Sequence, residues 1–246
     1  MIQWDNIKFR ASSWGNLLTE PRTKSEGALS VTCQKELIKI YNQVVYGRKT
    51  DITTKQMEKG IVCEPESIKL VSLVEGKIYF KNEEYLENQW FCGHPDIFIG
   101  ENVQNAEEIS DLKTSWSMDT FMPKLIESID KGYEAQLNCY YSLCNAKCGH
   151  IFYTLVSATP EMVEEEKYYL LKRLNVATEY SPEAIEAVEN LIKNMVFDDI
   201  NYLERVIKVY VPRNDELIQK MKDKVPVLRD WLKWFHEKHL SQYPKQ

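Results

Sequence analysis

The sequence of 246 residues predicts an α/β fold in which helices flank a small mixed sheet. Segments with helical periodicity alternate along the chain with short runs of aromatic and β-branched residues, which are typical of strands. The chain is long enough for one large domain, or for one domain that carries an insertion. It contains no repeat, no low-complexity tract and no apolar run long enough to span a membrane.

Two helical stretches are expected before the first strands of the main hairpin. Apolar residues at helical spacing indicate a helix over 29–46 that ends near Gly47. A second helical stretch covers 53–74 and contains Pro65. Because proline lacks the amide hydrogen and clashes with the preceding turn, we expect a bend there or the start of a new helix.

Short strands follow this stretch. One is expected around 78–80, and residues 90–99 carry the aromatic and β-branched side chains of another. Residues 100–102 indicate a turn, after which 108–114 resumes the strand pattern. The last two strands are therefore expected to pair as an antiparallel hairpin.

The second half of the chain alternates in the same way. A helix is expected around 133–140, and the apolar run within 150–157 indicates a buried strand. Two acidic amphipathic helices are expected over 161–174 and 182–195. A strand that alternates apolar and polar residues follows over 205–212, and a closing helix with one apolar stripe covers 214–239.

The expected hairpin carries the most informative residues of the chain. Asp96 follows Pro95, and Asp111 stands fifteen residues further on, two residues before Lys113. Carboxylate oxygens are hard ligands that suit Mg²⁺ or Mn²⁺. Because side chains two apart on a strand share one face, the Lys113 ammonium is expected beside the metal, where it favours the hydroxide form of a bound water. The alternative interpretation is a Pro-Asp turn and a solvated strand end.

Three further residues support a metal site. Glu64 supplies a third carboxylate, and three carboxylates at one place repel one another unless a divalent cation neutralises them. Gln136 and Tyr140 lie one turn apart on one face of a helix, where a neutral amide can orient the lysine or an attacking water. The alternatives are a solvated helix charge for Glu64 and an ordinary half-buried helix face for the other two.

The order of these motifs resembles the lambda-exonuclease-like (YqaJ) branch of the PD-(D/E)XK, restriction-endonuclease-like nuclease superfamily. The matching pieces are Glu64, Pro95-Asp96, Asp111-Leu112-Lys113 and Gln136-x-x-x-Tyr140. Residues 10–18 look like the Ala-Ser segment of that branch, and 20–24 look like the basic turn after it. The likeness covers 1–157 and 204–240, so 160–203 is expected to be a helical insertion within a single nuclease domain over 1–246.

The resemblance implies a restriction-endonuclease-like nuclease core and a metal-dependent DNA exonuclease. The implied reaction is hydrolysis of phosphodiesters from the 5′ end of linear double-stranded DNA, in phage-type recombination or DNA processing. The implied cofactor is Mg²⁺, for which Mn²⁺ substitutes. The implied metal ligands are Asp96, Asp111, the backbone carbonyl of Leu112, and Glu64 directly or through water; Lys113 assists the attacking water and Gln136 positions it.

The resemblance also implies contacts and partners. The expected DNA-binding residues are Arg10, Ser12, Ser13, Arg22, Lys24 and Tyr140, with the two serines binding a phosphate at the strand end. Such enzymes are often ring-shaped trimers and usually pair with a single-strand annealing protein, so a homo-oligomer and that partner are expected. The expected location is the cytoplasm of a bacterial or phage-infected cell, because no leader or membrane span is evident.

Three departures from the family pattern leave alternatives open. Ile97 stands where glycine usually follows Pro-Asp, Pro65 directly follows Glu64, and no upstream arginine stands where the family often holds the 5′ phosphate. The third departure weakens the 5′-end assignment more than the nuclease assignment. A structure-selective endonuclease, a Cas4-like single-strand nuclease and a non-catalytic DNA-binding relative are the alternatives.

The net charge of −6 is unusual for a protein that binds DNA, but the acidity is uneven. Acidic residues concentrate in 161–166, 183–189 and 198–199, whereas the first 60 residues and the last helix are mildly basic. A positive channel inside a negative exterior is therefore expected.

The six cysteines allow a second metal hypothesis. Cys139, Cys144 and Cys148, with Cys33 far upstream, resemble the cysteine group of iron–sulfur nucleases related to Cas4. However, Cys139 lies inside the Gln-x-x-x-Tyr helix and the chain has no Cys-x-x-Cys pair, which favours free thiols in a reducing compartment.

Overall fold

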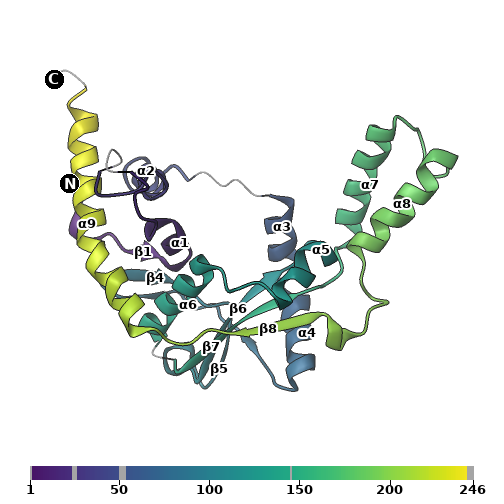
Figure 1. The fold of residues 1–246 in the computed structure, drawn as a ribbon, viewed down its shortest axis with the longest axis horizontal. Coiled ribbons are helices and arrows are strands. Elements are labelled where there is room, and N and C mark those ends of the chain that lie inside the picture. The colour runs from purple at the N-terminus through teal and green to yellow at the C-terminus, as the bar shows by residue number, and fades with distance from the viewer. Residues whose placement is uncertain (1, 24–26, 50–53, 145, 243–246) are drawn as a thin grey trace.

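The structure, a computed structural model, describes residues 2–23, 27–49, 54–144 and 146–242 (Figure 1). Its centre is a sheet of five strands in the order β2-β5-β6-β7-β8. They are β2 (Phe80–Lys81), β5 (Ile97–Ile99), β6 (Glu108–Thr114), β7 (Cys148–Thr154) and β8 (Val206–Tyr210). Strands β6 and β7 are parallel, and the other neighbouring pairs are antiparallel. The predicted mixed sheet flanked by helices is confirmed.

A second, three-stranded sheet has the order β1-β4-β3. Its strands are β1 (Phe9–Arg10), β4 (Phe91–Gly93) and β3 (Leu86–Glu87), with β1 parallel to β4. The prediction of one strand over 90–99 is therefore wrong, because β4 and β5 belong to different sheets. Pro95 lies between them, and proline cannot donate to a strand ladder.

The N-terminal helices begin and end at residues with clear signals. They are α1 (Trp14–Leu17), α2 (Val31–Tyr46), α3 (Lys55–Val62) and α4 (Glu64–Glu75). The Ser30 side chain accepts a hydrogen bond from the Cys33 amide at the start of α2, which ends at Gly47 with φ 62°. Pro65 stands in the first turn of α4, where its missing amide costs little. The proline thus separates two helices, and Glu64 opens the second.

Helices cover both faces of the five-stranded sheet. After β6 the chain forms α5 (Met118–Phe121), the 3-10 helix η5 (Met122–Leu125) and α6 (Lys131–Cys144). Ile109 packs in the main core with Leu137 of α6, whereas Leu112 packs with Val71 of α4. Since side chains alternate along a strand, α6 and α4 lie against opposite faces of β6.

The C-terminal third forms a projecting hairpin and a long closing helix. Figure 1 shows α7 (Pro160–Leu174) and α8 (Pro182–Met195) packed on each other at the opposite end of the molecule from α9 (Asp215–Leu240). The hairpin has a small core of its own, made of Leu170, Ala184 and Val188. The apolar stripe of α9 is buried at Ile218, Met221, Val225, Leu228 and Leu232, as predicted. That 160–203 is an insertion within one domain stays a prediction.

Within the part of the chain that the structure describes, no helix is both long and apolar enough to cross a membrane. The 3-10 helices η1 (Trp4–Asn6), η2 (Ala11–Ser13), η4 (Val103–Asn105) and η6 (Tyr202–Glu204) complete the described elements. Sequence periodicity did not predict these single turns, nor α5, because one turn is too short to show a period.

Candidate active site

Strand β6 places a carboxylate and an ammonium side by side. Asp111 and Lys113 project from the same face, and the Lys113 ammonium forms an ion pair with Asp111 Oδ2. Asp111 is 1% exposed, and the Lys113 ammonium also stands 4.5 Å from the centre of the Tyr133 ring. Burial alone lowers the pKa of Lys113, but the charges of Asp111 and Asp96 outweigh burial and raise that pKa above its usual value. The lysine is therefore held as an ammonium.

Asp96 joins this pair from the neighbouring strand. It directly precedes β5, whose Ile97 lies opposite Ser110 in the antiparallel ladder. Asp96 Oδ2 accepts a 2.7 Å hydrogen bond from the Leu112 amide. Burial, followed by the negative charge of Asp111, raises the pKa of Asp96 well above its usual range. Two carboxylates therefore lie close enough to repel each other.

Helix α6 adds an amide and a phenol. Gln136 Nε2 donates to Asp111 Oδ1 at 3.0 Å and to the Tyr140 hydroxyl at 2.9 Å. The two side chains are buried, and their spacing of four residues puts them on one face of the helix, as predicted. Burial and the charges of Asp111 and Asp96 raise the pKa of Tyr140, so this residue stays a neutral phenol.

Gly93 brings the N-terminal segment against this helix. It adopts φ 147°, which side-chain-bearing residues rarely adopt. A Cβ at this position would lie 3.3 Å from both Ala11 Cβ and Tyr140 Cε1. The absence of a side chain thus lets η2, which carries Ser12 and Ser13, approach the tyrosine of the site.

Glu64 stands at the margin of the site. It opens α4 and its Oε2 is 3.3 Å from Lys81 Nζ, and its charge contributes to the raised pKa of Asp96. Among the described residues, however, no group of three or more His, Cys, Asp or Glu side chains is arranged to hold a metal ion. Asp96 and Asp111 lie close together, as expected, while the Glu64 carboxylate forms an ion pair with Lys81. Mutual repulsion of the acids gives a physical reason for this arrangement.

The donor chemistry of the two aspartates suits a hard divalent cation. Asp111 Oδ2 is buried, and the Lys113 ammonium is ion-paired with it. Two buried carboxyl groups lie beside a single ammonium here, and a divalent cation bound between their oxygens would neutralise their negative charge. The Leu112 carbonyl stays a predicted ligand.

A basic cavity of about 530 Å³ lies between η2 and α2. Arg10, Ser12 and Ser13 line it, as do three cations that the sequence did not single out, Lys8, Lys39 and Lys49. Ser12 is exposed, whereas Ser13 is buried and its hydroxyl donates to Glu36 at 3.0 Å. The three lysines were missed because the cavity forms only when η2 packs beside α2.

Two other predicted DNA contacts are not placed in this cavity. Arg22 is exposed between α1 and α2 and does not line it. Lys24 lies outside the residues that the structure describes.

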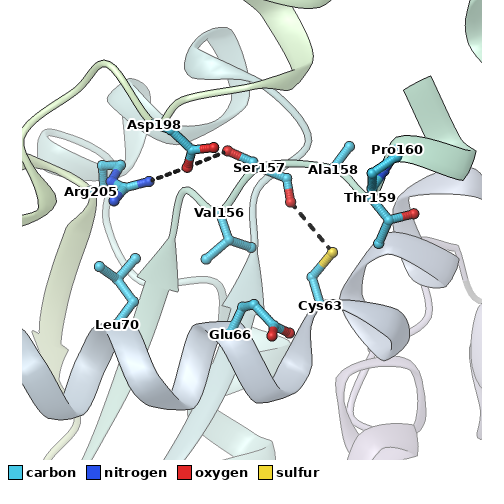
Figure 2. Close-up of a pocket in the computed structure, with 10 residues that line it drawn as sticks. All are labelled: Cys63, Glu66, Leu70, Val156, Ser157, Ala158, Thr159, Pro160, Asp198 and Arg205. Atoms are coloured by element: carbon cyan, nitrogen blue, oxygen red, sulfur yellow. Dashed lines mark hydrogen bonds and ion pairs between the residues drawn. The ribbon is translucent and has the colours of Figure 1, made fainter. Parts of the chain in front are cut away.

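A second cavity, of about 400 Å³, lies at the base of the α7–α8 hairpin (Figure 2). Its polar groups bind one another: Ser157 Oγ donates to Asp198 at 2.9 Å, and Arg205 lies 3.5 Å from the same carboxylate. The Cys63 thiol donates to the Ser157 carbonyl at 3.6 Å. This cavity contains none of the predicted site residues.

The cysteines are free thiols, and they are spread over several elements. Cys139 and Cys144 are buried on α6, Cys33 is buried on α2, and Cys148 is half-buried on β7. No three of them form a metal-holding group within the described ranges, so the structure gives the iron–sulfur hypothesis no support.

Solved structures of exonucleases have the same arrangement of helices and strands as this chain. A phage-related exonuclease from Haemophilus somnus 129PT superposes with a TM-score of 0.70 at 21% identity, covering 95% of this chain and 97% of that one. The chain shares the fold of this exonuclease. LHK-Exo, an alkaline exonuclease from Laribacter hongkongensis, superposes with a TM-score of 0.63 at 12% identity, covering 98% of this chain and 99% of its own. The resemblance and the fold class predicted from the sequence are thus confirmed at the level of the fold.

LHK-Exo in complex with dAMP gives a TM-score of 0.61 at 12% identity, over 96% of this chain and 95% of that one. The chain matches no protein-family model and no curated protein. At these identities the fold is shared, while the roles of individual residues stay predictions.

Proposed function

We propose that this protein is a Mg²⁺-dependent exonuclease that hydrolyses linear double-stranded DNA from the 5′ end, with Mn²⁺ able to substitute. The observation that carries the proposal is the meeting of Asp96, Asp111, Lys113 and Gln136 at one buried site. The same fold occurs in two exonucleases, one of which was solved with the mononucleotide dAMP. A nucleotide monophosphate is the product that an exonuclease releases.

Asp96 and Asp111 would hold the metal, together with the Leu112 carbonyl. Glu64 would complete the shell, directly after leaving Lys81 or through a water. When bound, the metal neutralises the carboxylates and acts as a Lewis acid on the phosphodiester. Burial, followed by the charge of Asp111, raises the pKa of Asp96, and a cation bound at this carboxyl group would favour its charged form.

Lys113 and Gln136 have distinct tasks in this proposal. The Lys113 ammonium donates to the attacking water and stabilises negative charge that develops on the phosphate. At about 4 Å and an effective dielectric near 20, one such charge pair contributes about 4 kcal/mol. Gln136 fixes Asp111 Oδ1 by donating to it, and its neutral amide adds no charge that would compete for the cation.

The basic cavity supports recognition of a strand end. Arg10, Lys8, Lys39 and Lys49 line it together with Ser12, and cations with hydroxyls suit a terminal phosphate. Because η2 meets Tyr140 at Gly93, a phosphate bound there would lie on the side of the site occupied by that tyrosine. This proximity is the structural support for 5′ polarity. A trimeric ring and an annealing partner stay predictions from the resemblance.

A duplex labelled separately at its 5′ and 3′ ends tests the proposal. We expect release of the 5′ label as mononucleotide, dependent on Mg²⁺, while the 3′ label remains on a long strand. A covalently closed circular duplex should remain intact. Nicking of the circle would favour the endonuclease alternative, and an unchanged linear duplex at all metal concentrations would refute nuclease activity.

A further inference from the structure

Helix α3 contains a lysine that is buried almost completely and plays no part in the mechanism above. Lys59 is 1% exposed, although the flanking Lys55 and Glu58 face solvent. Charged side chains are rarely buried without an oppositely charged partner, because desolvation of the ammonium is costly. Burial lowers the pKa of Lys59 to about 8. Such a side chain is expected to be kept for the contacts that it makes.

The contacts of Lys59 are with the chain directly after β6. Its ammonium donates to the Ser115 carbonyl at 3.0 Å and to the Trp116 carbonyl at 3.1 Å. Strand β6 ends at Thr114, one residue after Lys113. The Ser115 amide is also fixed, since it donates to the Thr154 carbonyl at the end of β7. Lys59 therefore holds the point at which the strand of the active site ends.

Aromatic rings close the other sides of the ammonium. It lies 5.1 Å from the centre of the Phe197 ring and 5.9 Å from that of Trp116. Phe197 follows α8 and is itself buried, with its amide donating to Ser157 Oγ at 2.9 Å. Trp116 packs against the cluster of Ala158, Val163 and Met195 at the base of the α7–α8 hairpin. The Lys59 side chain thus connects its own helix, α3, to the end of β6 and to the base of the hairpin.

We propose that Lys59 is a positioning residue: it fixes the end of β6, and with it Lys113, and connects the α7–α8 hairpin to the active site. The inference rests on the proposed nuclease function for its kinetic consequence. A displacement of about 1 Å in a catalytic group can reduce turnover about 100-fold, so a fixed strand end has a direct effect on rate. The Lys59 ammonium donates to the Ser115 and Trp116 carbonyls, and the side chain is 1% exposed, so substrate binding should not depend on it.

Lys59→Met tests the proposal, because methionine keeps most of the stem and removes the donors. We expect a folded protein whose kcat falls about 10–100-fold while KM for duplex DNA is unchanged. Lys59→Arg restores donors to the two carbonyls and should recover part of the lost kcat. The matched control is Lys69→Met on α4, where an exposed lysine is removed and kcat should not change.

Phe197→Leu tests the link to the hairpin separately. It keeps Lys59 and removes the ring over it, so kcat should fall by a smaller factor than in Lys59→Met. Amide exchange of the peptide over 108–116 should be faster in both variants and unchanged in Lys69→Met. This exchange measurement needs no activity. If the wild-type protein cleaves no DNA, the proposed function fails while the positioning role is still tested.

Either of two results from Lys59→Met would overturn the inference. One is a folded Lys59→Met protein with wild-type kcat and wild-type exchange over 108–116. The other is a raised KM with unchanged kcat, which would place Lys59 in substrate binding. If Lys59→Met does not fold, wild-type kcat and exchange in Phe197→Leu would overturn the inference.

Discussion

Replacement of Glu108 by glutamine should change how the stability of the fold depends on pH. Glu108 begins β6 on the face opposite Asp111 and is 6% exposed. Its Oε1 accepts 3.0 Å hydrogen bonds from the Tyr79 hydroxyl and from His150 Nδ1, and Lys77 Nζ lies 3.5 Å from Oε2. Although burial acts in the opposite direction, these donors and charges lower the pKa of Glu108 from 4.5 to about 2.

The magnitude follows from linkage between protonation and folding. The pKa of Glu108 is lower in the folded than in the unfolded protein, so its ionised carboxylate stabilises the fold. This stabilisation is fully present above pH 4.5 and is lost as the pH falls toward 2. The whole shift corresponds to at most about 3 kcal/mol of unfolding free energy, of which about 2 kcal/mol should be lost by pH 3. Glutamine cannot ionise, so Glu108→Gln should not lose this contribution on acidification.

Urea unfolding followed by circular dichroism, without divalent metal, measures the effect. The difference in unfolding free energy between wild type and Glu108→Gln should be largest at pH 7 and should narrow by about 2 kcal/mol at pH 3. Glu107→Gln, at the exposed neighbouring position, is the matched control and should follow the wild-type curve. A difference that stays constant or widens from pH 7 to pH 3 would refute the reasoning.

Three further changes test the site. Lys113→Ala should reduce single-turnover cleavage by about 10²–10⁴ while Mn²⁺ binding by calorimetry persists, and wild-type cleavage would remove the assigned role. Saturating Mg²⁺ should raise the melting temperature, because a free Mg²⁺ concentration of 100 times the dissociation constant adds about 2.7 kcal/mol to the free energy of unfolding. Asp111→Asn should abolish this rise. An equal rise in both proteins would contradict binding at Asp111. Gly93→Ala should destabilise the fold by about 1–3 kcal/mol in urea, because φ 147° and the 3.3 Å approach to Tyr140 both disfavour a side chain; unchanged stability would show that the backbone relaxes.

Much of the candidate site could be predicted because its parts are local. Asp111 and Lys113 share a face through the two-residue period of a strand, and Gln136 and Tyr140 share one through the helical period. The pairing of β5 with β6 followed from a turn signal between two strand-like runs. These relations depend on neighbouring residues alone, and the structure has each of them.

Sequence prediction failed where contacts between distant segments decide the structure. The run over 90–99 has a continuous strand-like composition, yet β4 and β5 join different sheets, since pairing partners and not propensity assign strands. Glu64 as a metal ligand stays a prediction, and its ion pair with Lys81 on β2 was not foreseen. Neither Lys81 nor the cavity lysines Lys8 and Lys39 carry a local signal that marks them.

The sequence by itself determined the element types, the nuclease-like order of motifs and the faces on which the acids, lysine and amide project, because each depends on short-range periodicity. Tertiary structure alone decided which cations meet which acids, how η2 and α2 enclose a basic cavity, and that Lys59 is buried against the end of β6. Electrostatic contacts and burial act through space, between residues that can be more than a hundred positions apart, and no local pattern encodes those distances.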